Sequence, residues 1–152
     1  MLFGFSFFIM KAQKPVAIYD LSQYKNRVEQ KNDTLYIVNF WATWCKPCVE
    51  ELPYFQGLAT TYKNQAVKII LVSQDAKART LQVAQFIQKN NYTSEVFLLS
   101  AGNPNVWIDA IEPKWSGTIP ATILYKNGIK IDFHEGDFPN QKAIEDFIHS
   151  KL

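Results

Sequence analysis

The stretch that decides the fold is Val38-Asn39-Phe40-Trp41-Ala42-Thr43-Trp44-Cys45-Lys46-Pro47-Cys48. It holds both cysteines of the 152-residue chain, and it begins within an apolar run, residues 35–41, that is typical of a strand buried on both faces. The following residues, from about 45 to 62, predict a helix with Pro47 in its first turn, where a missing N–H removes no helical hydrogen bond. The stretch therefore predicts a strand that leads directly into a helix, with the cysteines at the helix start.

Outward from this stretch, apolar runs and helical periodicity alternate along the chain. Residues 67–72 predict a second buried strand, so that strand, helix and strand form one parallel unit. Further elements are expected as a helix at 79–90, a strand at 96–99, a short helix at 105–111 and a closing helix at 139–151.

A hairpin is predicted around Asn127-Gly128, which is the strongest short signal for such a turn. It would join residues 121–125 to residues 129–134. In the second strand apolar and polar side chains alternate, so we expect an antiparallel strand with one exposed face. The apolar set is Ile129, Ile131 and Phe133, and the polar set is Lys130, Asp132 and His134. The expected fold class is α/β, a mixed central sheet flanked by helices on both faces.

Composition excludes several classes of protein. The net charge is +2, from 16 basic and 14 acidic residues with no run of like charge, so we expect no nucleic-acid partner. Two cysteines are too few for a disulfide-scaffolded miniprotein. Because no repeat or linker divides the chain, we expect one domain at residues 14–152, and a monomer.

The N-terminal residues have a different composition from the rest. Residues 2–10 are apolar and uncharged and are followed directly by Lys11. Nine residues are too few to span a bilayer, which takes about 20, but they suit the apolar region of a secretory signal. An apolar segment that packs on the domain or on a neighbouring molecule is the alternative. We expect residues 1–13 to be a signal or anchor remnant, and the protein to act outside the cytoplasm.

Residues 38–48 resemble the active-site segment of the thioredoxin superfamily. The next residues, Val49-Glu50-Glu51-Leu52-Pro53, resemble the extracytoplasmic thioredoxin-like reductases of the TlpA/ResA type, which carry Trp-Cys-x-Pro-Cys-x-x-Glu-x-Pro. The resemblance extends from about residue 35 to the C-terminus, and residues 16–33 fit loosely as a preceding strand and helix. It implies a thioredoxin-like fold, a redox-active Cys45–Cys48 disulfide and a thiol–disulfide oxidoreductase that needs no cofactor.

The family reading gives each site residue a role. A helix N-terminus stabilises negative charge, so Cys45 would be the attacking thiolate and Cys48 the resolving thiol. Many thioredoxins have a buried Asp where this chain has Asn39, which cannot titrate. Glu51, three residues after Cys48, is the candidate to carry the proton instead, with a solvated surface carboxylate as the alternative.

A second group of residues is expected to border a bound substrate. Trp44, Lys46 and Pro47 flank the cysteines. Ile119-Pro120 resembles the family's cis-proline loop, which offers backbone hydrogen bonds to a peptide; an ordinary trans proline at a strand start is the alternative.

Rival readings of the cysteine pair are weaker. Zinc needs four ligands, and besides the two cysteines the chain offers only His134 and His149, far along the sequence, so no metal site is expected. Haem attachment needs a His where Val49 stands. A purely structural bridge across so short a loop would stabilise the fold little, because it removes little entropy from the unfolded chain.

The resemblance also implies partners and a direction of electron flow. We expect reduction of protein disulfides, such as those of apocytochrome c in cytochrome c biogenesis, in the periplasm or at a bacterial membrane, with a membrane electron donor. Four other functions are the alternatives. An oxidase of the DsbA type usually carries a helical insertion for which this chain has no room, and an isomerase direction stays open. A non-catalytic binding module does not need the intact pair, and a thiol peroxidase has a Pro and a Thr ahead of its reactive Cys, a pattern that Thr43-Trp44-Cys45 lacks.

Overall fold

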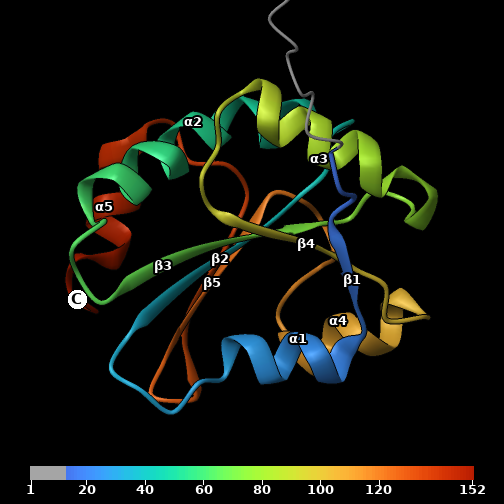
Figure 1. Ribbon diagram of the computed structural model, residues 1–152. Helices are drawn as coiled ribbons and strands as arrows, with labels where there is room; N and C mark the ends of the chain where they lie inside the picture. Colours follow the sequence, from blue (N-terminus) through green and yellow to red (C-terminus); the bar gives the residue numbers. More distant parts are fainter. Residues whose placement is uncertain (1–12) are drawn as a thin grey trace, which may run out of the picture.

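The computed structural model describes residues 13–152 and contains a six-stranded sheet between two layers of helices (Figure 1). The strands are β1 Ala17–Tyr19, β2 Leu35–Trp41, β3 Val67–Ser73, β4 Glu95–Leu99, β5 Ala121–Lys126 and β6 Ile129–Glu135. The helices are α1 Leu21–Val28, α2 Lys46–Thr61, α3 Thr80–Lys89, α4 Pro104–Ile111 and α5 Gln141–His149, with a 3-10 turn at Lys77–Arg79. The expected α/β class with a mixed sheet is confirmed.

The sheet order is β1-β4-β3-β2-β5-β6, with β2 near the middle. The first four strands in this order run parallel, and β5 and β6 are antiparallel to their neighbours. All seven residues of β2 are buried, as its continuous apolar run predicts. The carboxyl ends of β2 and β3 lie side by side, with Trp41 opposite Ser73, and this edge of an open sheet is where α/β proteins place their sites.

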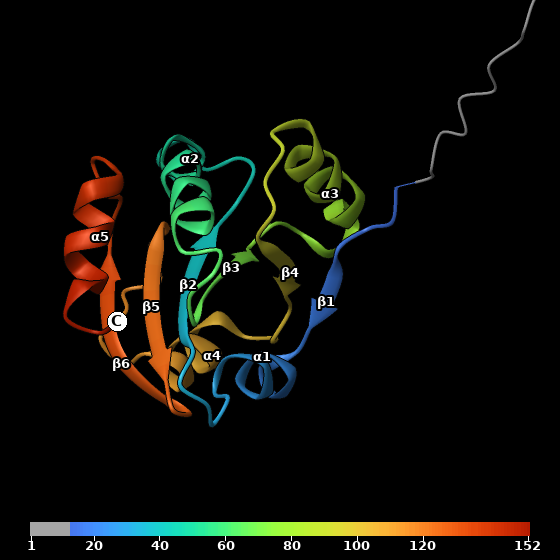
Figure 2. The same ribbon diagram turned by 60° about the vertical axis from the view of Figure 1, so that its left-hand side comes forward.

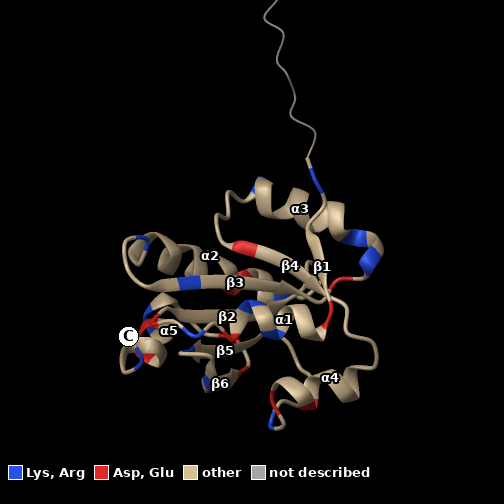
Figure 3. Cartoon of the chain, turned by 60° about the horizontal axis from the view of Figure 1, so that its bottom comes forward, with Lys and Arg blue, Asp and Glu red and all other residues tan. Residues whose placement is uncertain are grey.

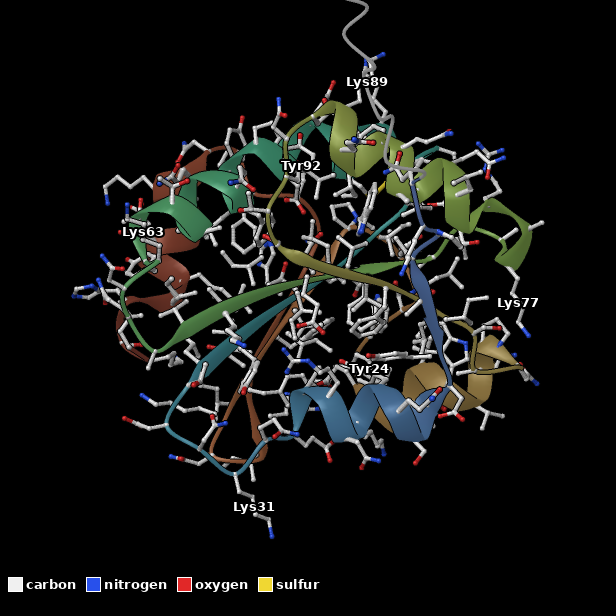
Figure 4. All side chains as sticks on the ribbon, viewed as in Figure 1. Tyr24, Lys31, Lys63, Lys77, Lys89 and Tyr92 are labelled. Atoms are coloured by element: carbon white, nitrogen blue, oxygen red, sulfur yellow. A yellow bond between two sulfur atoms is a disulfide. The ribbon has the colours of Figure 1, made fainter. Side chains whose placement is uncertain are left out.

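Helices cover both faces of the sheet, and each face has its own apolar core. Figures 1 and 2 show α2, α3 and α5 on one face and α1 and α4 on the other. Successive residues of β2 alternate between the cores: Ile37 packs with α2 and α5, and Val38 packs with α1 and α4. Tyr24 lies between α1 and the sheet in Figure 4, where its hydroxyl is 3.0 Å from that of Tyr125.

The helix α2 begins directly after Cys45, its N-cap residue, and has Pro47 in its first turn. Its buried residues are Cys48, Glu51, Leu52, Phe55 and Leu58. This spacing of three and four forms one helical face. Cys48 and Glu51 are therefore on the side of α2 that is turned toward the sheet.

The predicted hairpin is present, with a turn that needs its two residues. Asn127 has φ of 54° and Gly128 has φ of 80°. Two successive positive φ angles define the type I′ turn, which Asn-Gly tolerates best. The two strands therefore pair without a longer loop.

The expected alternation along β6 is wrong at one point. Leu124 pairs with Asp132, but Tyr125 pairs with Lys130, so Ile131 is an extra residue without a partner. Ile131 packs against the core under α2 and α5, whereas Phe133 packs against the opposite core. The bulge reverses the alternation, and both faces of the strand are partly covered.

The surface carries mixed charge. Figure 3 shows Lys and Arg interspersed with Asp and Glu along the helices and strands. Within residues 13–152 no helix combines the length and the apolar character needed to cross a membrane. The signal or anchor expected in residues 1–13 lies outside the described residues, apart from Gln13.

Candidate active site

Cys45 and Cys48 are joined by a disulfide at the start of α2, with an S–S distance of 2.10 Å. Cys48 is fully buried, whereas Cys45 keeps 6% of its surface exposed. Cys45 also precedes the first helical turn, where N–H groups without helical partners favour a negative charge. The placement suits Cys45 for attack and Cys48 for resolution, and these roles stay predictions.

The loop before β5 lies against Cys45. The Ile119-Pro120 peptide bond is cis, as expected, and the Ile119 carbonyl oxygen lies 3.8 Å from Cys45 Sγ. Buried Trp115 donates its indole N–H to the Thr118 carbonyl at 2.8 Å. The loop is thus anchored in the core on one side and lies against Cys45 Sγ on the other. Binding of a substrate by Ile119 and Pro120 stays a prediction.

Three residues expected to border a substrate flank Cys45 in the chain. Trp44 is 67% exposed, which is unusual for so large an apolar side chain. Pro47, also exposed, is in the first turn of α2. Lys46 is exposed, and its Nζ lies 3.8 Å from Glu50 Oε1, an exposed ion pair worth less than about 1 kcal/mol. These positions leave Trp44 and Lys46 accessible to a partner.

Glu51 is a buried residue of α2, one helical turn after Cys48. Its Oε1 accepts a hydrogen bond from Asn39 Nδ2 at 2.9 Å, and its Oε2 accepts one from the Phe138 N–H at 2.8 Å. Asn39 Nδ2 also donates to Thr122 Oγ1 at 3.2 Å. Since Glu51 is only 1% exposed, the reading of this side chain as a solvated surface carboxylate is wrong.

Burial raises the pKa of Glu51 from its ordinary value of 4.5 to about 7. The hydrogen bonds from Phe138 and Asn39 lower this pKa, and the charge of nearby Asp137 raises it, but the loss of hydration has the largest effect. A carboxyl group with a pKa near neutrality can both take up and release a proton at physiological pH.

A second buried carboxyl group, on Asp75, was missed by the sequence reasoning. It lies beyond the carboxyl end of β3, and it accepts hydrogen bonds from Thr43 N–H at 3.0 Å and from Ser73 Oγ at 2.9 Å. A polar residue just after a buried parallel strand, next to the strand that leads to the cysteines, is the signal that would have indicated it.

The histidines do not join the site. The ring of His134 stacks on Phe138 with centroids 4.1 Å apart, as expected for a structural role. His149 is the last residue of α5. Among residues 13–152 no group of three or more His, Cys, Asp or Glu side chains is arranged to hold a metal ion.

Comparison with known proteins gives one family. Residues 8–134 match the model of the AhpC/TSA family. A thiol-disulfide oxidoreductase ResA of Oceanobacillus iheyensis is 39% identical over 85 residues, 51% of this chain and 43% of that protein. The sporulation thiol-disulfide oxidoreductase A of Bacillus subtilis is 36% identical over 67 residues, 43% of this chain and 41% of that protein. The match therefore spans less than half the length of either relative.

The fold has solved counterparts. The crystal structure of StoA from Bacillus subtilis superposes with a TM-score of 0.58 and 24% identity, over 76% of this chain and 83% of that one. The thioredoxin-like fold expected from the sequence is thereby confirmed.

Glu51→Gln should change how stability depends on pH. Between pH 4.5 and about 7 the unfolded parent releases the Glu51 proton while the folded parent keeps it, so the free energy of unfolding falls as pH rises. The shift corresponds to a loss of about 3 kcal/mol across this window. Gln does not titrate, so the variant should gain stability relative to the parent by up to that amount between pH 4 and pH 8.

Urea unfolding of the oxidised proteins measures this difference. Glu50→Gln, a change at an exposed neighbour, is the matched control and should follow the parent. If the unfolding free energies of the Glu51 variant and the parent stay parallel throughout, the raised pKa of Glu51 is wrong.

Proposed function

The chain belongs to the AhpC/TSA family, and from this premise we propose that it catalyses thiol–disulfide exchange through Cys45 and Cys48. The observation that carries the proposal is the disulfide itself, closed between a buried Cys48 and a Cys45 at the N-cap of α2. A disulfide with a purely structural role does not need one of its sulfurs, here Cys45 Sγ, at a helix start and beside the Ile119 carbonyl. A sulfur in that position is suited to exchange with an incoming disulfide.

The first step starts from the dithiol form of the protein. The Cys45 thiolate attacks one sulfur of a substrate disulfide, an S–S bond to Cys45 forms, and the substrate S–S bond breaks. The departing substrate sulfur leaves as a thiolate and takes a proton from water. The product is a mixed disulfide between Cys45 and the substrate.

The second step releases the reduced substrate. Cys48 loses its proton and attacks Cys45 Sγ, and the second substrate sulfur leaves as a thiolate. The protein then holds the Cys45–Cys48 disulfide, and two electrons have passed to the substrate. Buried Cys48 has little access to water, so a proton acceptor within the protein is needed.

Glu51 is the group we assign to that proton. It is buried one helical turn from Cys48, and its pKa of about 7 allows the charged form to accept a proton near neutral pH. Asn39, at the position of the buried Asp of many thioredoxins, instead donates to Glu51 and keeps it oriented. In this chain the buried carboxyl group is therefore on the helix α2 and not on the strand β2.

We assign the reducing direction to this exchange. A strong oxidant needs an unusually stabilised Cys45 thiolate. Here the stabilisers are a helix N-terminus and an exposed Lys46, with no His between the cysteines. Such ordinary stabilisers favour a reductase over an oxidase.

Two features of the chain support the proposed substrates and location. Exposed Trp44 beside Cys45 offers an apolar surface to a polypeptide, so protein disulfides are the proposed substrates, including those of apocytochrome c. The apolar residues 2–10 before Lys11 support an extracytoplasmic location. There, a membrane electron donor would return the protein to its dithiol form.

Exchange of each cysteine for serine separates the two roles. The parent should accelerate the reduction of insulin by dithiothreitol, and Cys45→Ser should abolish this acceleration, because an alcohol is neither an appreciable anion nor a leaving group near neutral pH. Cys48→Ser should keep the attack but accumulate mixed disulfides, visible on non-reducing gels. Full turnover by Cys45→Ser would refute the assignment, and an inactive parent would favour a binding module.

The reduction potential tests the direction. We expect a value between about −220 and −290 mV, near that of thioredoxin at about −270 mV. The oxidant value of about −120 mV lies roughly 150 mV away, or about 7 kcal/mol, which Lys46 and a helix dipole cannot supply. Equilibration in glutathione or dithiothreitol buffers, read by thiol alkylation, gives the potential. A value more positive than about −180 mV would assign an oxidase or isomerase instead.

A further inference from the structure

A short loop, residues 42–44, connects β2 to Cys45. The Cys45 N–H donates to the Ala42 carbonyl at 3.2 Å, which closes the loop as a tight turn. The Trp41 carbonyl, just before the turn, accepts a hydrogen bond from the Gln74 N–H at 2.7 Å. The position of Cys45 relative to the Ile119 loop therefore depends on how this turn is held.

Asp75 holds the turn from the side of β3. Its side chain is completely buried. Its Oδ2 accepts the Thr43 N–H at 3.0 Å, and its Oδ1 accepts the Thr43 hydroxyl at 2.5 Å, so one carboxyl group accepts hydrogen bonds from both donors of Thr43. Ser73 steadies the carboxyl group, donating from Oγ to Oδ2 at 2.9 Å and accepting the Asp75 N–H at 3.1 Å.

The geometry makes this contact hard to replace. A turn that moved away would remove two of the three hydrogen bonds that the buried carboxyl group accepts, which is strongly unfavourable. The charged neighbour of Asp75, Arg79, is about half exposed, and its Nε lies 3.9 Å from Oδ1, so it adds little. The hydrogen bonds to Thr43 and Ser73 therefore carry the contact.

The contact matters most when the protein is reduced. In the disulfide form the bond to Cys48 ties the Cys45 sulfur to α2. In the dithiol form that bond is absent. The turn that Asp75 holds, directly before Cys45 in the chain, then has the larger share in fixing the position of the sulfur. Attack on a disulfide needs the sulfur in line with the bond that breaks, and a displacement of about 1 Å can cost on the order of a hundredfold in rate.

We propose that Asp75 is a positioning residue for disulfide exchange, which fixes the turn before Cys45 through its paired hydrogen bonds to Thr43. The inference rests on the proposed function of the cysteine pair. It assigns no contact with substrate to Asp75. It also differs from the role of Glu51, since Asp75 acts through Thr43 on the attack and Glu51 acts on the resolving thiol.

Two matched pairs of variants test the inference. Asp75→Ala removes both hydrogen bonds to Thr43, and Thr43→Val removes the one from the hydroxyl and keeps the one from the backbone N–H. Asp75→Asn keeps an oxygen for the Thr43 N–H and an NH₂ group that can donate to the Thr43 hydroxyl, and Thr43→Ser keeps the hydroxyl itself. The measurement is the rate constant for reaction of each reduced protein with oxidised glutathione at pH 7, under conditions where circular dichroism shows every variant folded.

The two disruptive variants should react about ten- to a hundredfold more slowly than the parent, and the two conservative variants should stay close to it. For Thr43→Val the pH midpoint of Cys45 alkylation by iodoacetamide should be unchanged, because the substitution removes a neutral hydroxyl and changes no charge near the sulfur.

Three results would overturn the inference. If the parent exchanges disulfides and the disruptive variants are folded, less stable and equally fast, Asp75 has a structural role only. If Asp75→Asn is as slow as Asp75→Ala, the charge matters and the hydrogen bonds do not. If the parent shows no exchange with glutathione or insulin, the proposed function fails and this inference fails with it.

Discussion

The burial of one carboxyl group, that of Glu51, is the constraint on which the rest of the site depends. A buried carboxyl group on the sheet side of α2 is tolerated because two groups donate hydrogen bonds to it. One is the Asn39 side chain of β2, and the other is the Phe138 N–H in the segment between β6 and α5. The site therefore requires α2, β2 and the segment that precedes α5 to meet at one point. The same burial gives Glu51 a pKa of about 7, one turn from Cys48, where the proposed exchange needs a proton acceptor and water has little access.

Asp75 is a second buried carboxyl group near the same disulfide, and its hydrogen-bond partners differ from those of Glu51. Glu51 accepts hydrogen bonds from two N–H groups and lies one helical turn from Cys48, whereas Asp75 accepts hydrogen bonds from the hydroxyl and N–H of Thr43 and lies beside the turn that leads to Cys45. The Ile119-Pro120 loop closes the third side of the site against Cys45. The two carboxyl groups share the same chemistry and differ in environment, and on that difference we assign proton transfer to Glu51 and positioning to Asp75.

Local signals predicted the elements but not the contacts between them. The strand β2 and the helix α2 follow from an apolar run and from Pro47 near a helix start, because such signals depend on nearby residues alone. The bulge at Ile131 was missed because register is set by the pairing with β5, while the sequence alternates without a break. The burial of Glu51 and the hydrogen bonds of Asp75 depend on partners 12 and 32 positions away in the chain, so a local pattern can indicate the position of a polar residue but not its partners.

The central claim is that Glu51 moves the proton of the resolving thiol, and the pH dependence of the resolution step tests it most directly. A mixed disulfide formed at Cys45 can be followed by stopped flow as Cys48 displaces the substrate, from pH 5 to pH 9, in the parent and in Glu51→Gln. The account predicts that the parent resolves faster, with a rise in rate centred near pH 7 that the variant lacks. Rates that overlay across the whole range would contradict it.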